Sequence, residues 1–149
     1  MALPTHLDLQ IVTPHRLVVR ERVDEAQIPG SEGYFGVLPG HTPLLASLGI
    51  GQLWYRKGAE KSYVAIAYGF AEVLPDGVTI LAQVAERGDE IDPARAEAAR
   101  KRADERLTLP RSDVDYDRAR IALAKALSRL QVSSRSGISP RSAAKQVRT

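Results

Sequence analysis

Short apolar segments separated by turn residues fill the first 86 residues of the chain. Leu7–Ile11 alternates apolar and polar side chains, as a strand with one buried face does. Further short apolar segments are 18–19, 26–28, 53–55, 63–67, 70–74 and 78–82. The turn signals between them are Thr13-Pro14, Pro29-Gly30, Pro39-Gly40, Lys57-Gly58, Tyr68-Gly69 and Pro75-Asp76-Gly77. This spacing predicts an antiparallel β-sandwich over residues 1–86, with a hairpin around Pro75–Gly77.

The pattern after Glu86 is typical of helices. Asp92 can accept hydrogen bonds from the first free amides of a helix, and Pro93 suits the first helical position. The Ala-rich segment that follows is expected to end at Leu109-Pro110, because the residue before proline avoids the helical region. A second helix is predicted from Ser112, with one face made of Tyr116, Ala119, Leu123, Ala126 and Leu130. Residues 87–132 should therefore form an antiparallel two-helix hairpin.

The face that would join these two helices is thin. It alternates Leu with Ala, and each buried methylene contributes only about 0.8 kcal/mol. We therefore expect weak packing between the helices and onto the sandwich. The corresponding hypothesis is that the hairpin can detach and adopt another pose.

Charge is distributed unevenly along the chain. The net charge of +3 divides into −3 over residues 1–86, +2 over 87–132 and +4 over 133–149. The last segment lacks periodicity and is expected to be a disordered basic tail. Because the basic excess lies there, we expect no nucleic-acid binding. Cysteine is absent, so disulfides and thiol chemistry are excluded, and the first ten residues do not resemble a signal peptide.

Residues 33–55 contain no charged side chain. The segment is long enough for a membrane span, which needs about 20 residues. Its five glycines and two prolines make a membrane helix unfavourable. His41, within this segment, could be a general base or a loop imidazole bonded to backbone, and we favour the second interpretation.

Motifs for catalysis are missing from the sequence. It contains no phosphate-binding loop, dinucleotide-binding turn, His-Glu-x-x-His or Gly-x-Ser-x-Gly. His6, His15 and His41 are too scattered for a zinc motif. We therefore expect no catalytic residue, no metal site and no enzyme activity of the chain by itself.

Several segments, in chain order, resemble one family. GYFGVLPGHTPLL at 33–45 is similar to the signature loop of the epsilon subunit of bacterial F-type ATP synthases. Other similar segments are 10–14, 69–73, 78–82, 85–87, 91–96 and 113–116, so that the resemblance covers residues 5–132. It implies the same β-sandwich and helical hairpin.

The resemblance also implies a function. Such a subunit is a non-catalytic part of the central stalk that turns with the rotor, coupling proton-driven rotation to ATP synthesis. The implied partners are the gamma subunit, the ring of c subunits and, through an extended hairpin, the alpha and beta subunits. The implied location is peripheral, at the cytoplasmic face of the bacterial plasma (inner) membrane. In bacterial members the extended hairpin inhibits ATP hydrolysis. The alternative is a free-standing ATP-sensing module without a rotor role.

A docking surface is expected in the uncharged stretch. Its candidate residues are Tyr34, Val37, Leu38, Pro39, Gly40, His41 and Thr42. Members of the family often carry glutamate where this chain has Tyr34. An aromatic contact is therefore expected to replace an acidic contact with the c-ring loops.

The resemblance requires no cofactor, but it implies ATP as a regulatory ligand in some members. The corresponding positions are Glu86, Asp92, Arg95, Arg102 and Arg129. Arginine forks suit phosphate oxygens, and carboxylates suit an adenine amine or a ribose hydroxyl. Lys125 stands where a nucleotide-binding relative has Arg, which removes the bidentate geometry. The structural alternative is that Asp92 is a helix cap and the arginines form a solvated face.

Overall fold

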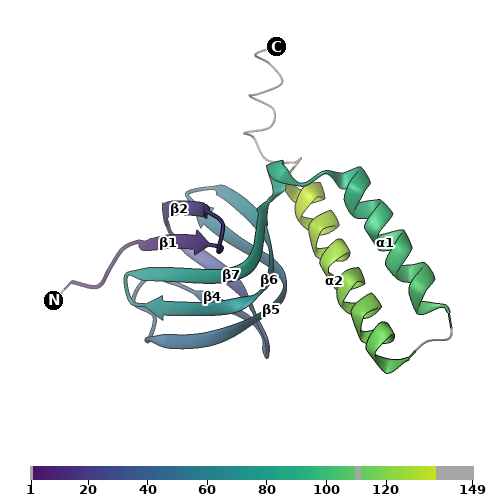
Figure 1. Cartoon of the computed structure of the whole chain (residues 1–149). Coiled ribbons are helices and arrows are strands. Elements are labelled where there is room, and N and C mark those ends of the chain that lie inside the picture. The colour runs from purple at the N-terminus through teal and green to yellow at the C-terminus, as the bar shows by residue number, and fades with distance from the viewer. Residues whose placement is uncertain (1, 110–111, 137–149) are drawn as a thin grey trace, which may run out of the picture.

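The computed structural model describes residues 2–109 and 112–136 and shows a β-sandwich followed by a two-helix hairpin, which confirms the predicted fold class (Figure 1). The strands are β1 (Leu7–Val12), β2 (Leu17–Val23), β3 (Glu25–Gly30), β4 (Gly33–Val37), β5 (Leu44–Lys57), β6 (Glu60–Leu74) and β7 (Gly77–Arg87). A 3-10 turn, Gly88–Glu90, leads to α1 (Pro93–Leu107) and α2 (Asp113–Ser136).

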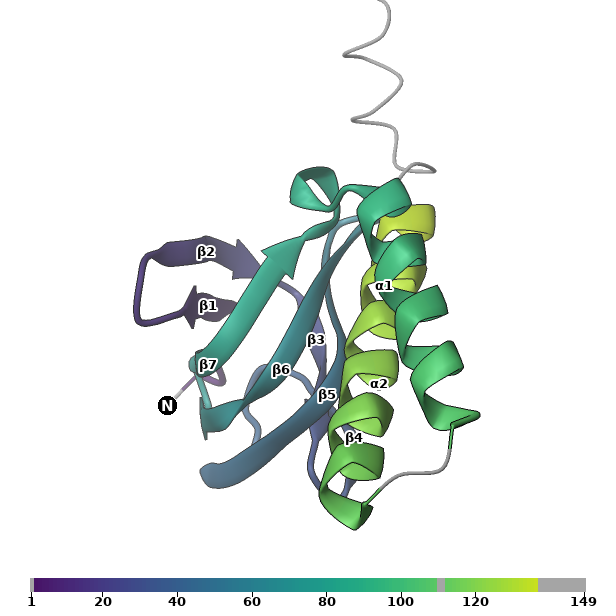
Figure 2. The same cartoon turned by 45° about the vertical axis from the view of Figure 1, so that its right-hand side comes forward.

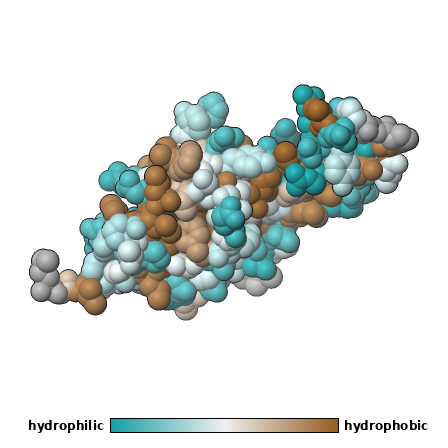
Figure 3. All heavy atoms as spheres, turned by 90° about the horizontal axis from the view of Figure 1, so that it is seen from below, coloured by the Kyte–Doolittle hydropathy of each residue, from teal (hydrophilic) through white to brown (hydrophobic). Residues whose placement is uncertain are grey.

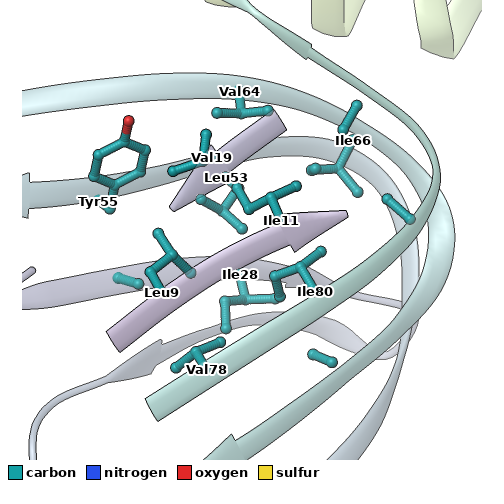
Figure 4. Close-up of a cluster of buried hydrophobic side chains, with 14 of the residues drawn as sticks. Leu9, Ile11, Val19, Ile28, Leu53, Tyr55, Val64, Ile66, Val78 and Ile80 are labelled. Carbon is teal, nitrogen blue, oxygen red and sulfur yellow. The ribbon is translucent and has the colours of Figure 1, made fainter. Parts of the chain in front are cut away.

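One curled sheet of seven strands forms the sandwich, in the order β2-β1-β7-β6-β5-β3-β4. Its pairs are antiparallel except for the parallel pair β1–β7. The hairpin predicted around Pro75–Gly77 is confirmed, since Leu74 pairs with Gly77. Figure 4 shows the apolar side chains that fill the interior, among them the fully buried Leu9, Leu53 and Ile80. The alternation seen in the sequence thus buries one face of β1, whereas residues 64–67 of β6 are buried on both faces.

The segments 63–67 and 70–74, predicted as separate strands, form the single strand β6. The interpretation of Tyr68-Gly69 as a turn is wrong, because the chain bends there without reversing. Tyr68 has a φ of 60° and Gly69 a φ of 131°. Tyr68 is skipped in the pairing with β7, but the register is the same on both sides of it, so the two residues form a local distortion inside a continuous strand.

Replacing Gly69 by Ala is expected to destabilise the fold by about 2 kcal/mol. A Cβ at this positive φ would overlap the carbonyl oxygen of Leu81 on the neighbouring strand. Urea unfolding measures the effect. The matched control is Gly36→Ala, because a Cβ at Gly36 meets no atom within 4 Å. Equal midpoints for the two variants would contradict the requirement for glycine at position 69.

The hairpin lies against the sandwich through α2. Figure 2 shows α2 between the sheet and α1, in agreement with the contacts of α2 with β5, β6 and α1. The predicted cap is confirmed, since Asp92 accepts from Ala94 N at 3.0 Å and from Arg95 N at 3.3 Å. Helix α2 runs to Ser136, past the predicted end of the hairpin at residue 132. Residues 137–149 of the predicted tail lie outside the described residues.

Small side chains form the buried part of the hairpin. The buried residues are Ala96 and Ala103 on α1, and Ala119, Ala126, Ser128 and Val132 on α2. Tyr116, which was predicted on the packed face, is exposed. Ala65, Ile91, Ala96 and Val132 form a small cluster, separate from the main core, which we call the base cluster. It joins the beginning of α1 and the end of α2 to the sheet.

None of the helices in the described part of the chain is long and apolar enough to cross a membrane.

Candidate docking surfaces and nucleotide site

An apolar area of the sheet is left uncovered by the hairpin. Phe70 on β6 pairs with Leu81 on β7, which lies beside Val12 on β1, and Val12 pairs with Leu17 on β2. Leu45 on β5 is a diagonal neighbour of Phe70. Their exposed fractions are 49% for Leu17, 71% for Leu45, 55% for Phe70 and 55% for Leu81. We call these four residues the face patch.

Figure 3 shows apolar side chains gathered on the underside of the sandwich. Exposed apolar residues next to one another on a single sheet face indicate a binding surface. The sequence reasoning missed the face patch. A signal was present in the strand alternation, because Phe70 directly precedes buried Ala71 and Leu81 lies between buried Ile80 and Ala82.

The predicted docking loop lies at one end of the sandwich. Its outer part consists of Leu38, which is exposed, and Pro39–Thr42. The backbone N–H of Gly40 donates to Pro75 O at 2.7 Å. This bond holds the loop beside the β6–β7 turn. Leu38, Leu44 and Leu74 are all exposed, and we call these three residues the end patch.

Two residues of the predicted loop differ in their roles. Val37 is fully buried, so its assignment as a partner contact is wrong. It pairs with Ala26 and faces inward, because side chains alternate along β4. Tyr34 is half exposed, and its hydroxyl accepts from Gln52 N at 3.1 Å. Tyr34 can therefore present its ring while its hydroxyl stays bonded to β5.

His41 is held by its neighbour. Its Nδ1 lies 2.6 Å from Thr42 O, and because a carbonyl only accepts, Nδ1 donates the proton. This confirms the interpretation of His41 as a loop imidazole bonded to backbone.

The structure brings together two of the five proposed nucleotide residues. Glu86 Oε1 lies 2.8 Å from both Nε and Nη2 of Arg129, which joins the sheet to α2. Lys125 lies over the ring of Tyr68, with 5.6 Å between its Nζ and the ring centroid. Glu86, Lys125, Ser128 and Arg129 line a shallow hollow with room for about one water molecule, together with residues of β6 and β7. Small-molecule pockets are usually about 300 to 1,000 Å³.

The other three proposed nucleotide residues lie elsewhere. The carboxylate of Asp92 caps α1, as the alternative interpretation of this residue as a helix cap predicted. Arg95 and Arg102 are exposed on α1 and do not line the hollow. In this pose the hollow is small, and its arginine already has a carboxylate partner. Nucleotide binding there would require Glu86 to release Arg129.

The connector between sandwich and hairpin carries a strong ion pair. Arg16, in the β1–β2 turn, donates from Nη1 to Glu90 Oε1 at 2.8 Å and from Nη2 to Oε2 at 2.5 Å. Glu90 Oε2 also accepts from Arg87 N at 3.3 Å. The Arg16 hydrogen bond is the main reason why the pKa of Glu90 falls to about 2.

The ion pair predicts how stability depends on pH. Because the pKa of Glu90 is lowered, its contribution is complete above the unfolded value of 4.5 and is lost as the pH falls from there toward 2. Arg16 is half exposed, so solvent screening keeps the contribution of the pair modest. Glu90→Gln should therefore be less stable than the unmodified chain at neutral pH. Urea titrations should show this gap closing between pH 4.5 and 2, and a gap independent of pH would contradict the assignment.

In the described ranges, no group of three or more His, Cys, Asp or Glu side chains could hold a metal ion.

The uncovered apolar area of the sheet is typical of proteins that bind other proteins. The model of the ATP synthase delta/epsilon chain β-sandwich domain matches residues 6–88, and that of the long α-helix domain matches 89–134. The epsilon chain of Syntrophobacter fumaroxidans is 51% identical over 85% of this chain and 94% of its own length. The epsilon chain of Koribacter versatilis is 56% identical over 67% of this chain and 70% of its own length.

Solved structures agree with these relatives. A chain in the mitochondrial ATP synthase of Euglena gracilis (OSCP/F1/c-ring) has a TM-score of 0.76 and 26% identity, covering 86% of this chain and 81% of that one. A chain in the Tetrahymena thermophila mitochondrial ATP synthase structure (central stalk/c-ring) shares the fold, with a TM-score of 0.56 and 11% identity. The match covers 91% of this chain and 98% of that one. The chain therefore belongs to the ATP synthase delta/epsilon family and is a non-catalytic subunit of that membrane-associated complex.

Proposed function

We propose that the chain is a rotor subunit of the central stalk, which docks through its sandwich and regulates ATP hydrolysis through its hairpin. The observation that carries this proposal is the face patch, which the hairpin leaves bare. Burial of a Leu or Phe side chain contributes about 1.5 to 3 kcal/mol. Four such side chains on one rigid sheet can therefore supply the centre of a stable interface.

The two patches can serve two partners at the same time. The face patch lies on the outer surface of β2, β5, β6 and β7, whereas the end patch lies at the strand ends beside the β6–β7 turn. We assign the face patch to the gamma subunit, and the end patch with Tyr34 to the ring of c subunits. The complex would then hold the chain at the cytoplasmic face of the bacterial plasma membrane.

Capture on membranes tests the docking role. The tagged full chain should bind membranes that contain the ATP synthase depleted of this subunit, and it should recover gamma and c subunits after detergent extraction. ATP binding without such capture would instead favour the free-standing ATP-sensing module.

The packing of α2 on the sheet supports a movable hairpin. The buried side chains of α2 are small, and two buried side-chain oxygens on the described residues lack a hydrogen-bond partner, namely Ser128 Oγ and Gln52 Oε1. Gln52 pairs with Ala65, so its side chain lies on the sheet face that α2 covers. Each unpartnered buried group costs about 1 to 3 kcal/mol. Exposing both oxygens to water reduces the cost of detaching α2, which can then reach the alpha and beta subunits.

We propose that ATP is a regulatory ligand, which binds Arg129 in place of Glu86. Lys125→Arg is expected to tighten ATP binding by about tenfold, because a guanidinium can bind phosphate oxygens in pairs. Calorimetry of both forms with ATP measures the change. Lys125→Gln is the matched control and should weaken binding. No heat with either the unmodified chain or Lys125→Arg at millimolar ATP would remove the sensing role and leave the docking role intact.

A further inference from the structure

The connector between the sheet and α1 has two parts, one attached to the sandwich and the other attached to the hairpin. Its first part, Arg87–Glu90, is attached to the sandwich. Arg16 holds both oxygens of Glu90 from the β1–β2 turn, and Arg87 Nη2 lies 3.0 Å from Glu90 Oε1. Because Arg16 and Arg87 both belong to the sandwich, the 3-10 turn stays with the sheet wherever the hairpin lies.

The second part, Ile91-Asp92, is attached to the hairpin. Asp92 caps α1 through Ala94 N and Arg95 N, so its carboxylate moves with the helix. The side chain of Ile91 packs in the base cluster with Ala96 of α1 and Val132 of α2. Detaching the hairpin separates Ala96 and Val132 from Ala65 of the sheet, but it need not change the Asp92 cap.

Backbone freedom is concentrated at Ile91. Asp92 precedes Pro93, which restricts it to the extended conformation it has here, with φ −85° and ψ 109°. Glu90, the residue before Ile91, is held by Arg16. Ile91 itself is extended, with φ −84° and ψ 128°, and its backbone N–H makes a long bond of 3.4 Å to Gly88 O. Its two dihedral angles can change without breaking the ion pair or the cap.

The last turn of α2 rests on the fixed part of the connector. A Cβ at Gly88 would overlap the side chain of Ser136 and come within 3.2 Å of Val132 O. The absence of a side chain at Gly88 therefore lets the end of α2 close onto the 3-10 turn. The hairpin thus pivots beside a surface that belongs to the sandwich.

We infer that Ile91 is the pivot of the hairpin and that the Arg16–Glu90 pair fixes the 3-10 turn to the sandwich in both the docked and the detached pose. This inference rests on the proposed movement of the hairpin. It assigns Arg16 and Glu90 to the stationary side of the hinge and Glu86–Arg129 to the contact that must open.

Two tethers distinguish the sides of the hinge. The chain has no cysteine, so the double variants Arg16→Cys/Glu90→Cys and Glu86→Cys/Arg129→Cys can each be bridged by one short bis-maleimide. Each variant replaces an ion pair of similar reach, which makes the two tethers matched controls for one another. Amide hydrogen exchange of the full chain is measured before and after bridging, with the sheet amides as the internal reference.

The expected result is asymmetric. Bridging 86 to 129 should slow exchange in residues 93–136 by about tenfold or more, because α2 can no longer leave the sheet. Bridging 16 to 90 should change it by less than about twofold, since these residues do not move apart. If bridging 16 to 90 slows exchange as much as the other tether, the pivot lies before Glu90 and the inference is overturned. Hairpin protection equal to that of the strands before bridging would overturn the movable hairpin and its pivot together.

Discussion

Phe70→Glu combined with Leu81→Glu is expected to abolish binding of the chain to the rotor while leaving the sandwich folded. Both side chains are half exposed and pair across β6 and β7 at the centre of the face patch. Their replacement removes apolar area and places two negative charges in an interface that would exclude water. Central apolar residues of an interface often contribute 2 kcal/mol or more each, so we expect a loss of about 4 kcal/mol, or roughly a thousandfold in Kd.

Capture on depleted membranes measures this loss, and circular dichroism with urea unfolding verifies the fold. Lys57→Glu is the matched control, because it changes the net charge by the same −2 at an exposed site, the last residue of β5. It should bind normally. If the double variant is captured as well as the control, the face patch is not the docking surface.

Val132→Asp is expected to release the hairpin from the sandwich. Val132 is fully buried in the base cluster, and a carboxylate there would lose its water without gaining a partner. The main core does not include Val132, so the strands should remain folded. The hairpin can relieve the cost by detaching, and we expect hydrogen-exchange protection of residues 93–136 to fall at least about a hundredfold.

The same substitution tests how the docked and extended poses of the hairpin affect ATP hydrolysis. In the assembled enzyme, Val132→Asp should lower ATP hydrolysis because it favours the extended hairpin, whereas truncation after Glu86 should raise it. Leu127→Asp is the control, since it adds the same charge at an exposed position of α2. Unchanged protection of the hairpin in Val132→Asp would contradict the role of the base cluster. Unchanged hydrolysis in the truncated form would argue against an inhibitory hairpin.

Local patterns were sufficient for most elements and for the family. Period-two alternation in β1, the Pro75–Gly77 turn and the Asp92 cap are each set by a few neighbouring residues, and the structure confirms all three. Tyr68-Gly69 was misinterpreted because a distortion within a strand and a turn can both use positive φ. Only pairing with the next strand distinguishes the two.

The candidate surfaces were harder to predict. The loop at residues 34–42 was singled out because it lacks charge, yet Val37 within it is buried, because strand alternation rather than composition decides which side chain is exposed. The face patch combines residues from four strands that are distant in sequence. A single strand shows only one or two of its members, so no local window reveals a continuous apolar area.

The sequence by itself determined the β-sandwich, the helical hairpin and the alanine-rich packing of the two helices, because these follow from periodicity, caps and side-chain size. The tertiary structure decided which sheet face α2 covers and which face stays bare. It also decided the partner of Arg129 and the attachment of the connector through Arg16. These features depend on contacts between residues far apart in the chain, such as the 43 positions between Glu86 and Arg129 and the 74 between Arg16 and Glu90. Local propensity does not encode such pairings; packing of the whole chain selects them.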